Sequence, residues 1–350
     1  MAAHRITRRQ ALLGAGAMAA LACTPGTTTA TGAPAASGTP AVQVAKFNWL
    51  FGFVIQAGPV LPIVMAKQLG YYDQQKIAIS WDFQTVSTAV RLIGTDQYQG
   101  GNSDPQTTAG FVTEGVPLVA VAQQSLTSVR AFAVRKNDGI KRPKDFEGRK
   151  VGIKSGAPWA DYLAVLAADK VDRTKITEVP IGFSSVELKE KIVDVLPVFL
   201  GNEPFVLKTQ LNVDYDILLP RDFGYPAVGT PIIANKSYIK NNRDVYLRFL
   251  RSVFHAQEDF IANKDLAMKT AIEYGGTATT KEAHDFIYEV SKPTMINPKG
   301  AGFIDVAAWQ KNLDILTDLK VLPGKVNAAD IVDDTLMPQI LKDGKVIWPG

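Results

Sequence analysis

The sequence predicts an α/β protein made of two lobes, and three observations support this. The chain has 350 residues, which is long for one compact unit and suits two units of roughly 100–200 residues each. Hydrophobic residues make up 46% and charged residues 21% of the chain, as in a globular protein with a core. Segments with strand patterns alternate with segments of helical periodicity, which indicates βαβ units and a largely parallel sheet.

The first predicted unit begins near residue 43. Residues 42–47 alternate between polar and apolar side chains and predict a strand. Residues 118–122 read LVAVA, a continuous apolar run typical of a strand in a sheet covered on both faces. The other expected elements of this unit are a strand at 77–83 and helices at 61–69, at 87–93 and after residue 104.

A second unit is predicted after residue 133, with a strand at 151–153 and a helix opened by Pro158. The apolar run 193–200 also predicts a strand, and Pro197 is expected to confine it to a sheet edge or to split it. Residues 232–234 are expected to return to the first unit. The remaining chain predicts helices at 244–261, 265–274, 280–290 and 306–319.

The N-terminus predicts export. Residues 1–22 combine a basic head with an apolar, Ala/Gly-rich stretch and form a signal peptide. Arg8 and Arg9 resemble a twin-arginine signal, although the general secretory route stays open. Cys23 follows Ala20-Leu21-Ala22, which resembles a lipobox, and is the expected site of lipid attachment. Residues 23–42 then read as a flexible tether that leaves the protein anchored on the extracytoplasmic face of the cell membrane.

Charge and cysteine usage exclude several classes of protein. The formal charge falls from +4 to +1 once the three arginines of residues 1–22 are removed, so no nucleic-acid partner is expected. Cys23 is the only cysteine, which excludes an internal disulfide and a multi-cysteine metal site. We therefore expect no metal and no cofactor.

Several short motifs resemble one family of proteins. They are GYYD at 70–73, GVPLVAVAQ at 115–123, FEGRKVGI at 146–153 and VDV at 193–195. Over residues 43–320 the chain resembles the NMT1/THI5-like branch of solute-binding proteins of bacterial ABC importers. This branch holds binders of sulfonates, nitrate, the pyrimidine precursor of thiamine, and riboflavin. The motifs GNEP at 201–204 and FGY at 223–225 look more like those of the thiamine-pyrimidine and riboflavin members.

The resemblance implies a periplasmic-binding-protein-like fold of type 2, with a ligand cleft between two lobes. Lobe 1 would comprise residues 43–133 plus 231–350, and lobe 2 residues 134–230. Closure would be a hinge motion, and the closed form would be recognised by a permease and its ATPase. The protein is expected to act as a monomer.

Aromatic side chains near strand ends are candidate ligand contacts. Trp49, Phe51 and Phe53 follow the first predicted strand and are expected either to stack on a flat ligand or to pack in the core. Trp159 and Tyr162 lie in the first turns of the helix opened by Pro158, where free N–H groups favour polar ligand atoms. Packing is an equally good explanation for Trp159.

Polar candidates also follow predicted strands. Asp104 is expected to cap a helix or to contact ligand. Glu203 lies in the turn after the 193–200 strand, where ligands meet open α/β sheets, although an ordinary turn remains an alternative. Asn202, from the same turn, and Tyr225 complete the candidate set.

A carboxylate at Glu203 favours a ligand with N–H donors and disfavours nitrate or sulfonate. The expected ligand is therefore a planar heteroaromatic vitamin or precursor, either riboflavin or the aminopyrimidine of thiamine. The alternative is a sulfonate or nitrate binder that uses Arg91, Arg130 or Arg221.

A pyrimidine synthase is a further alternative, because such an enzyme shares this fold. The only histidines are His4, His255 and His284, and they lack metal-site spacing; nor is there a Gly-x-Ser-x-Gly motif. A binding protein is thus expected, not an enzyme.

Overall fold

The computed structural model describes residues 42–52, 58–226, 228–275 and 279–349. The predicted signal peptide, the lipid-attachment site Cys23 and the candidate ligand residue Phe53 lie outside the described residues, as does all but the last residue of the tether.

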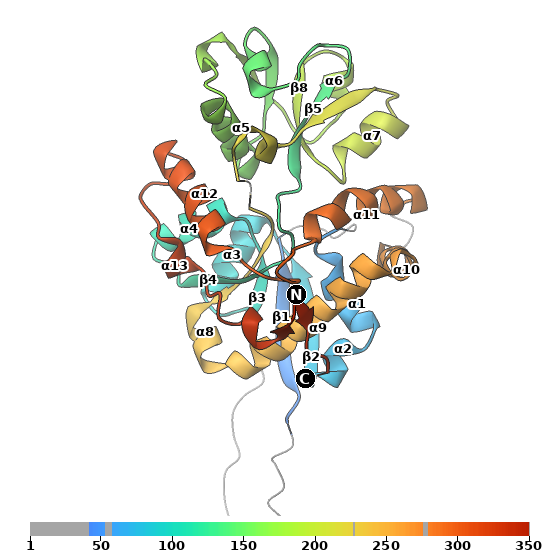
Figure 1. Ribbon diagram of the computed structural model, residues 1–350, viewed down its shortest axis with the longest axis vertical. Coiled ribbons are helices and arrows are strands. Elements are labelled where there is room, and N and C mark those ends of the chain that lie inside the picture. Colours follow the sequence, from blue (N-terminus) through green and yellow to red (C-terminus); the bar gives the residue numbers. More distant parts are fainter. Residues whose placement is uncertain (1–41, 53–57, 227, 276–278, 350) are drawn as a thin grey trace, which may run out of the picture. The chain divides into compact units, whose positions relative to one another are not determined.

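The first sheet has the strand order β2-β1-β3-β10-β4. Figure 1 labels its strands β1, β2, β3 and β4. Strand β1 pairs in parallel with both β2 and β3, whereas β10 runs antiparallel between β3 and β4. Residues 232–234 thus return to this sheet as expected. The strands are β1 (Ala45–Phe51), β2 (Ile77–Phe83), β3 (Gly100–Asn102), β4 (Leu118–Gln123) and β10 (Pro231–Asn235).

Helices cover both faces of this sheet. On one face the core contains Phe47, Trp49 and Phe51 of β1, and on the other it contains Leu50. Alternation along β1 therefore sends neighbouring residues into different cores. The core that contains Trp49 also includes residues of four helices: α1 (Leu61–Gln68), α2 (Tyr71–Gln74), α9 (Arg243–Ala262) and α10 (Lys264–Gly275). The core that contains Leu50 includes residues of four others: α3 (Val86–Gly94), α4 (Pro105–Thr113), α12 (Val306–Asp318) and α13 (Ala328–Ile331).

The second sheet has the order β7-β6-β8-β5-β9. Strands β7, β6 and β8 run parallel, and β5 pairs antiparallel with β8 and β9. The strands are β5 (Arg130–Arg135), β6 (Lys150–Ile153), β7 (Thr177–Pro180), β8 (Val195–Phe199) and β9 (Tyr215–Leu218), and the helices are α5 (Ala157–Ala168), α6 (Val186–Lys189) and α7 (Glu203–Thr209).

The edge position expected for the strand containing Pro197 is wrong, because β8 is the central strand of its sheet. Pro197 pairs with Phe132 of β5, whereas the pairing of β8 with β6 stops at Val195. The Pro197 Cδ lies 3.3 Å from where a Cβ on Gly152 would be, so the ring occupies space that Gly152 of β6 leaves free. The Pro197 nitrogen, which has no N–H to donate, thus faces β6 where the two strands are no longer paired.

Two chain segments connect the sheets. Residues 124–129 lead from β4 to β5, and residues 219–230 lead from β9 to β10. The segments pair through a bridge between Thr127 and Val228 and through the Gln124 N–H, which donates to the Thr230 carbonyl.

The C-terminal part of the chain adds α8 (Lys236–Asn241), α11 (Lys281–Met295), β11 (Leu341–Lys342) and β12 (Lys345–Val346). In the described part of the chain, no helix combines the length and apolar character needed to cross a membrane.

Candidate functional site

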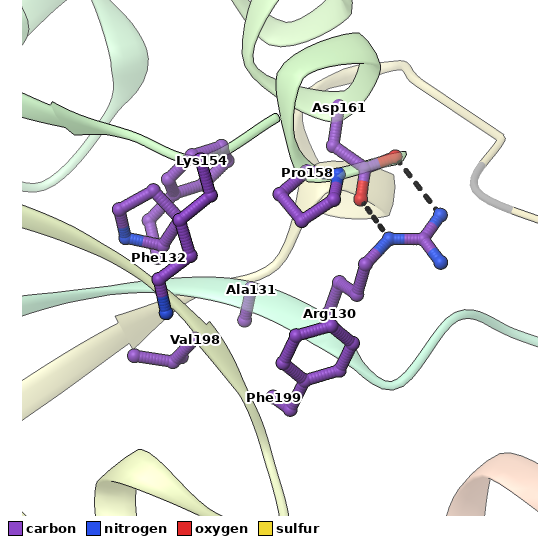
Figure 2. A pocket seen from close by; sticks show the side chains of 9 residues that line it. Arg130, Ala131, Phe132, Lys154, Pro158, Asp161, Val198 and Phe199 are labelled. Atoms are coloured by element: carbon purple, nitrogen blue, oxygen red, sulfur yellow. Dashed lines mark hydrogen bonds and ion pairs between the residues drawn. The ribbon is translucent and has the colours of Figure 1, made fainter. Parts of the chain in front are cut away.

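A small pocket lies beside the carboxyl ends of β6 and β8 (Figure 2). Its space is about 210 Å³, including the part open to solvent. Strand β5 forms one wall and the first turns of α5 form another. The lining residues are Arg130, Ala131, Phe132, Lys154, Pro158, Asp161, Pro197, Val198 and Phe199.

Arg130 and Asp161 form a bidentate ion pair at this pocket (Figure 2). The Arg130 Nε donates to the Asp161 Oδ2 at 2.5 Å, and Nη2 donates to Oδ1 at 3.2 Å. Burial disfavours the charged guanidinium, but attraction to Asp161 and their hydrogen bond outweigh this, so the pKa of Arg130 is raised above its usual value. Arg130 therefore stays charged, and its side chain remains 16% exposed.

Lys154 and Glu203 form a second ion pair, and it is almost completely buried. The Lys154 Nζ lies 2.6 Å from the Glu203 Oε1, with side-chain exposures of 3% and 1%. The other carboxylate oxygen accepts the Phe199 N–H at 2.9 Å. The charge of Glu203 is thus neutralised within the second sheet's own core. The Glu203 carboxylate was expected from the sequence to disfavour nitrate or sulfonate. Because Lys154 neutralises this charge, Glu203 gives no reason to disfavour an anion.

Asp104 caps α4 and also acts on the ion pair at the pocket. Its carboxylate accepts the Thr107 N–H at 2.9 Å and the Thr107 hydroxyl at 2.8 Å. Its negative charge also contributes to the raised pKa of Arg130. Asp104 therefore brings a carboxylate from the first sheet's side close to Arg130. Contact with ligand stays a prediction.

Replacing Asp104 with alanine is expected to lower the free energy of unfolding by about 1 kcal/mol, the usual cost of losing an N-cap. Asp104→Asn keeps an oxygen that accepts the Thr107 N–H and should cost less. Urea denaturation of both variants measures this. An alanine variant as stable as the parent protein would show that the cap contributes nothing.

Tyr225 lies beside the same cluster. Its hydroxyl accepts a hydrogen bond from the Asn312 Nδ2 at 2.9 Å, and the same amide donates to the Pro226 carbonyl. Burial raises the pKa of Tyr225, and the nearby charge of Asp161 raises it further. Asn312 belongs to α12, so this contact joins the last helices of the chain to the segment that leaves β9.

Trp49 and Phe51 are core residues in the structure. Both are part of β1, which extends to Phe51 and not only to residue 47 as predicted. The Trp49 ring is fully buried, stacked on Phe249 at 5.2 Å and in edge contact with Phe51 at 6.0 Å. Core packing, one of the two roles expected for these residues, accounts for their contacts, and ligand contact stays a prediction.

The helix α5 presents Pro158 and Asp161 to the pocket, whereas Trp159 and Tyr162 are not among its lining residues. The Arg173 guanidinium lies 4.8 Å from the Trp159 ring, and the Tyr162 hydroxyl donates to Glu178 at 2.9 Å. Asn202 occupies the N-cap position of α7 without a side-chain cap bond. Of the predicted residues, Glu203 belongs to one of the two ion pairs, and Asp104 and Tyr225 act electrostatically on Arg130, whereas Trp159 and Tyr162 make their contacts with Arg173 and Glu178.

Of the nine pocket residues, only Arg130 was considered as a ligand contact from the sequence, in the alternative of an anion binder; the eight others, Lys154, Pro158, Asp161 and Phe199 among them, were not. Lys154 directly follows the predicted strand 151–153, and Phe199 ends β8, one residue before the end of the predicted strand 193–200. The rule that ligands lie beyond the carboxyl ends of strands would have selected both. Within the described ranges, no cluster of three or more His, Cys, Asp or Glu side chains is arranged to hold a metal ion.

Comparison with known proteins agrees with this architecture. The family described as NMT1/THI5 like matches residues 59–267, more than half of the chain. No curated protein sequence matches the chain.

Three solved structures show the same fold at low sequence identity. The periplasmic aliphatic sulphonate binding protein SsuA from Escherichia coli is 16% identical, with a TM-score of 0.67 over 83% of this chain and 92% of that one. The alkanesulfonate-binding protein SsuA from Xanthomonas axonopodis pv. citri, bound to MOPS, is 15% identical, with a TM-score of 0.63 over 84% and 99%. The periplasmic nitrate-binding protein NrtA from Synechocystis PCC 6803 is 14% identical, with a TM-score of 0.63 over 85% and 88%.

The fold and the family match agree: the chain forms two α/β sheets joined by two segments, and residues 59–267 match the family model. The chain belongs to the NMT1/THI5-like family and has the fold of periplasmic solute-binding proteins.

Proposed function

We propose that this protein is the solute-binding component of an ABC importer and captures a small, uncharged, planar heteroaromatic compound for delivery to a permease. The part of the chain built on the first sheet and the part built on the second sheet, which includes all of β5 (Arg130–Arg135), act as two lobes that close on the ligand. Lipid attachment at Cys23 holds the protein on the extracytoplasmic face of the membrane. Membership of the NMT1/THI5-like family and the periplasmic-binding-protein fold support this role.

The charge balance of the pocket carries the proposal for the ligand. The two cations that line it, Arg130 and Lys154, each have a carboxylate partner of their own, at 2.5 and 2.6 Å. Asp104 adds a third carboxylate whose charge acts on Arg130. An anionic ligand needs a surplus of positive charge, and this pocket has none. An uncharged ligand meets no such obstacle.

The lining of the pocket favours a planar ring. The apolar lining, with Phe132, Pro197 and Phe199, suits a ring, and the partly exposed guanidinium of Arg130 supplies N–H donors for a ring nitrogen or carbonyl. An aminopyrimidine of the thiamine-precursor type fits this description.

A second candidate is a sulfonate or nitrate anion, because a neighbouring hollow holds two arginines. Arg130 and Arg221 line it together with Thr127 and Ser128. The Arg221 Nη1 donates to the Thr127 hydroxyl at 2.8 Å, and its nearest carboxylate, Asp222, is 3.8 Å away and exposed. Arg221 is therefore the cation that an anion would use.

Isothermal titration of the purified protein distinguishes the two candidates. The probes are the aminopyrimidine precursor of thiamine, riboflavin, taurine and nitrate. We expect binding heat with the aminopyrimidine and none with taurine or nitrate. Heat with the anions alone, lost in Arg221→Ala, would replace the proposed ligand by the second candidate.

A further inference from the structure

Phe183 is the most exposed large apolar side chain among the described residues, at 68%. An exposed aromatic ring beside a pocket offers a π face on which a ligand in that pocket can stack. Phe183 lies in the short loop between β7 and α6. Phe183 was not among the ligand contacts predicted from the sequence.

The loop lies at the same edge of the sheet as the pocket. Strand β7 runs parallel to β6, and beyond its end the Ile181 N–H donates to the Ile153 carbonyl at 3.0 Å. The carboxyl ends of β6, β7 and β8 therefore meet here. Phe183 follows β7 just as Lys154 follows β6 and Phe199 ends β8.

Two pocket residues contact the Phe183 ring directly. The Lys154 Nζ lies 4.9 Å from its centroid, a cation–π distance. The Phe199 ring lies 6.3 Å away at an interplanar angle of 33°. Lys154 and Phe199 both line the pocket, so Phe183 lies next to it.

The loop is held in place before any ligand binds. Ser185 is buried, and its hydroxyl donates to the Glu203 carbonyl at 3.4 Å. Glu203 in turn fixes Lys154, whose ammonium group lies near the Phe183 ring. A ring held in position by a buried ion pair loses little conformational entropy when a ligand stacks on it.

We propose that Phe183 is a ligand-contacting residue and forms, with Phe199, an aromatic mouth that stacks on the flat ring of the ligand. This inference rests on the proposed function. It adds that Phe183 and Phe199 make the site specific for planar rings. Because both pocket cations are neutralised, selection by this mouth depends on the shape and π surface of the ligand and not on its charge.

The test compares three replacements of Phe183 by titration with the aminopyrimidine precursor of thiamine and with riboflavin. Phe183→Ala should weaken binding of the aromatic probe that the parent protein binds by roughly 5- to 150-fold, the range for loss of one stacking contact. Phe183→Leu, which keeps apolar surface without a ring, should recover only part of this loss. Phe183→Tyr keeps the ring and should bind as the parent protein does.

Ile192→Ala is the matched control, because Ile192 is 48% exposed and lies beyond the other end of α6. It should bind as tightly as the parent protein. Equal affinity in the parent protein, Phe183→Ala and Phe183→Leu would overturn the inference and leave the proposed function standing. A parent protein that binds neither aromatic probe would remove the proposed function, and the inference with it.

Discussion

Replacing Lys154 with alanine is expected to lower the free energy of unfolding by about 3–5 kcal/mol, the usual cost of breaking a buried ion pair. Glu203 is 1% exposed, and its Oε1 loses the ammonium group that lies 2.6 Å away. Only the Phe199 N–H would then remain as a hydrogen-bond donor to a buried carboxylate. The expected loss is large because Glu203 is buried and would be left without a cation.

Urea denaturation measures the effect, and a second lysine provides a matched control. Lys264 makes ion pairs of similar length, 2.6 Å to Asp285 and 2.5 Å to Glu289, but on the surface. Lys264→Ala should leave the free energy of unfolding nearly unchanged, because water solvates the freed carboxylates.

A double variant isolates the cause of the loss. Lys154→Met combined with Glu203→Leu removes both charges and should recover most of the stability lost in Lys154→Ala. If the two alanine variants, at Lys154 and Lys264, are equally stable, the Lys154–Glu203 pair does not have the burial described above.

Local patterns predicted most of the fold. Helix α9 spans Arg243–Ala262 against an expected 244–261, and β4 spans Leu118–Gln123 against 118–122. Both elements have long, regular apolar patterns, which residue periodicity reports directly. The end of strand β1 was harder to predict, because Trp49, Leu50 and Phe51 are all apolar and buried. The polar–apolar alternation that indicates a strand therefore stops before the strand does.

The site was predicted less well, because its main interactions join distant residues. Glu203 was expected in the turn after the 193–200 strand as a candidate ligand contact, and it does follow β8, at the start of α7. Its partner Lys154 comes 49 residues earlier, and Arg130 precedes Asp161 by 31 residues. No local sequence pattern connects these pairs. The neutralisation of Arg130 and Lys154, on which the choice of an uncharged ligand rests, therefore depends on how β5, β6 and β8 are paired in the fold.

Replacing Trp49 with alanine is expected to lower the free energy of unfolding by about 3–5 kcal/mol, the range for deleting a large buried aromatic ring. Its indole fills the space between Phe51 and Phe249, and none of it is exposed. Trp49→Phe keeps an aromatic ring there and should lose less. Thermal and urea unfolding of both variants measure the difference.

Phe183→Ala is the counterpart, because its ring is also large but mostly exposed. Surface replacements usually change stability by no more than about 0.5 kcal/mol, so this variant should unfold like the parent protein. The two aromatic residues are thus expected to separate stability from affinity: Trp49→Phe changes unfolding but not ligand binding, and Phe183→Ala does the reverse. A Trp49→Phe variant with unchanged stability and weakened binding of the aminopyrimidine would assign Trp49 to the ligand instead, because loss of a core contact cannot lower affinity while leaving unfolding untouched.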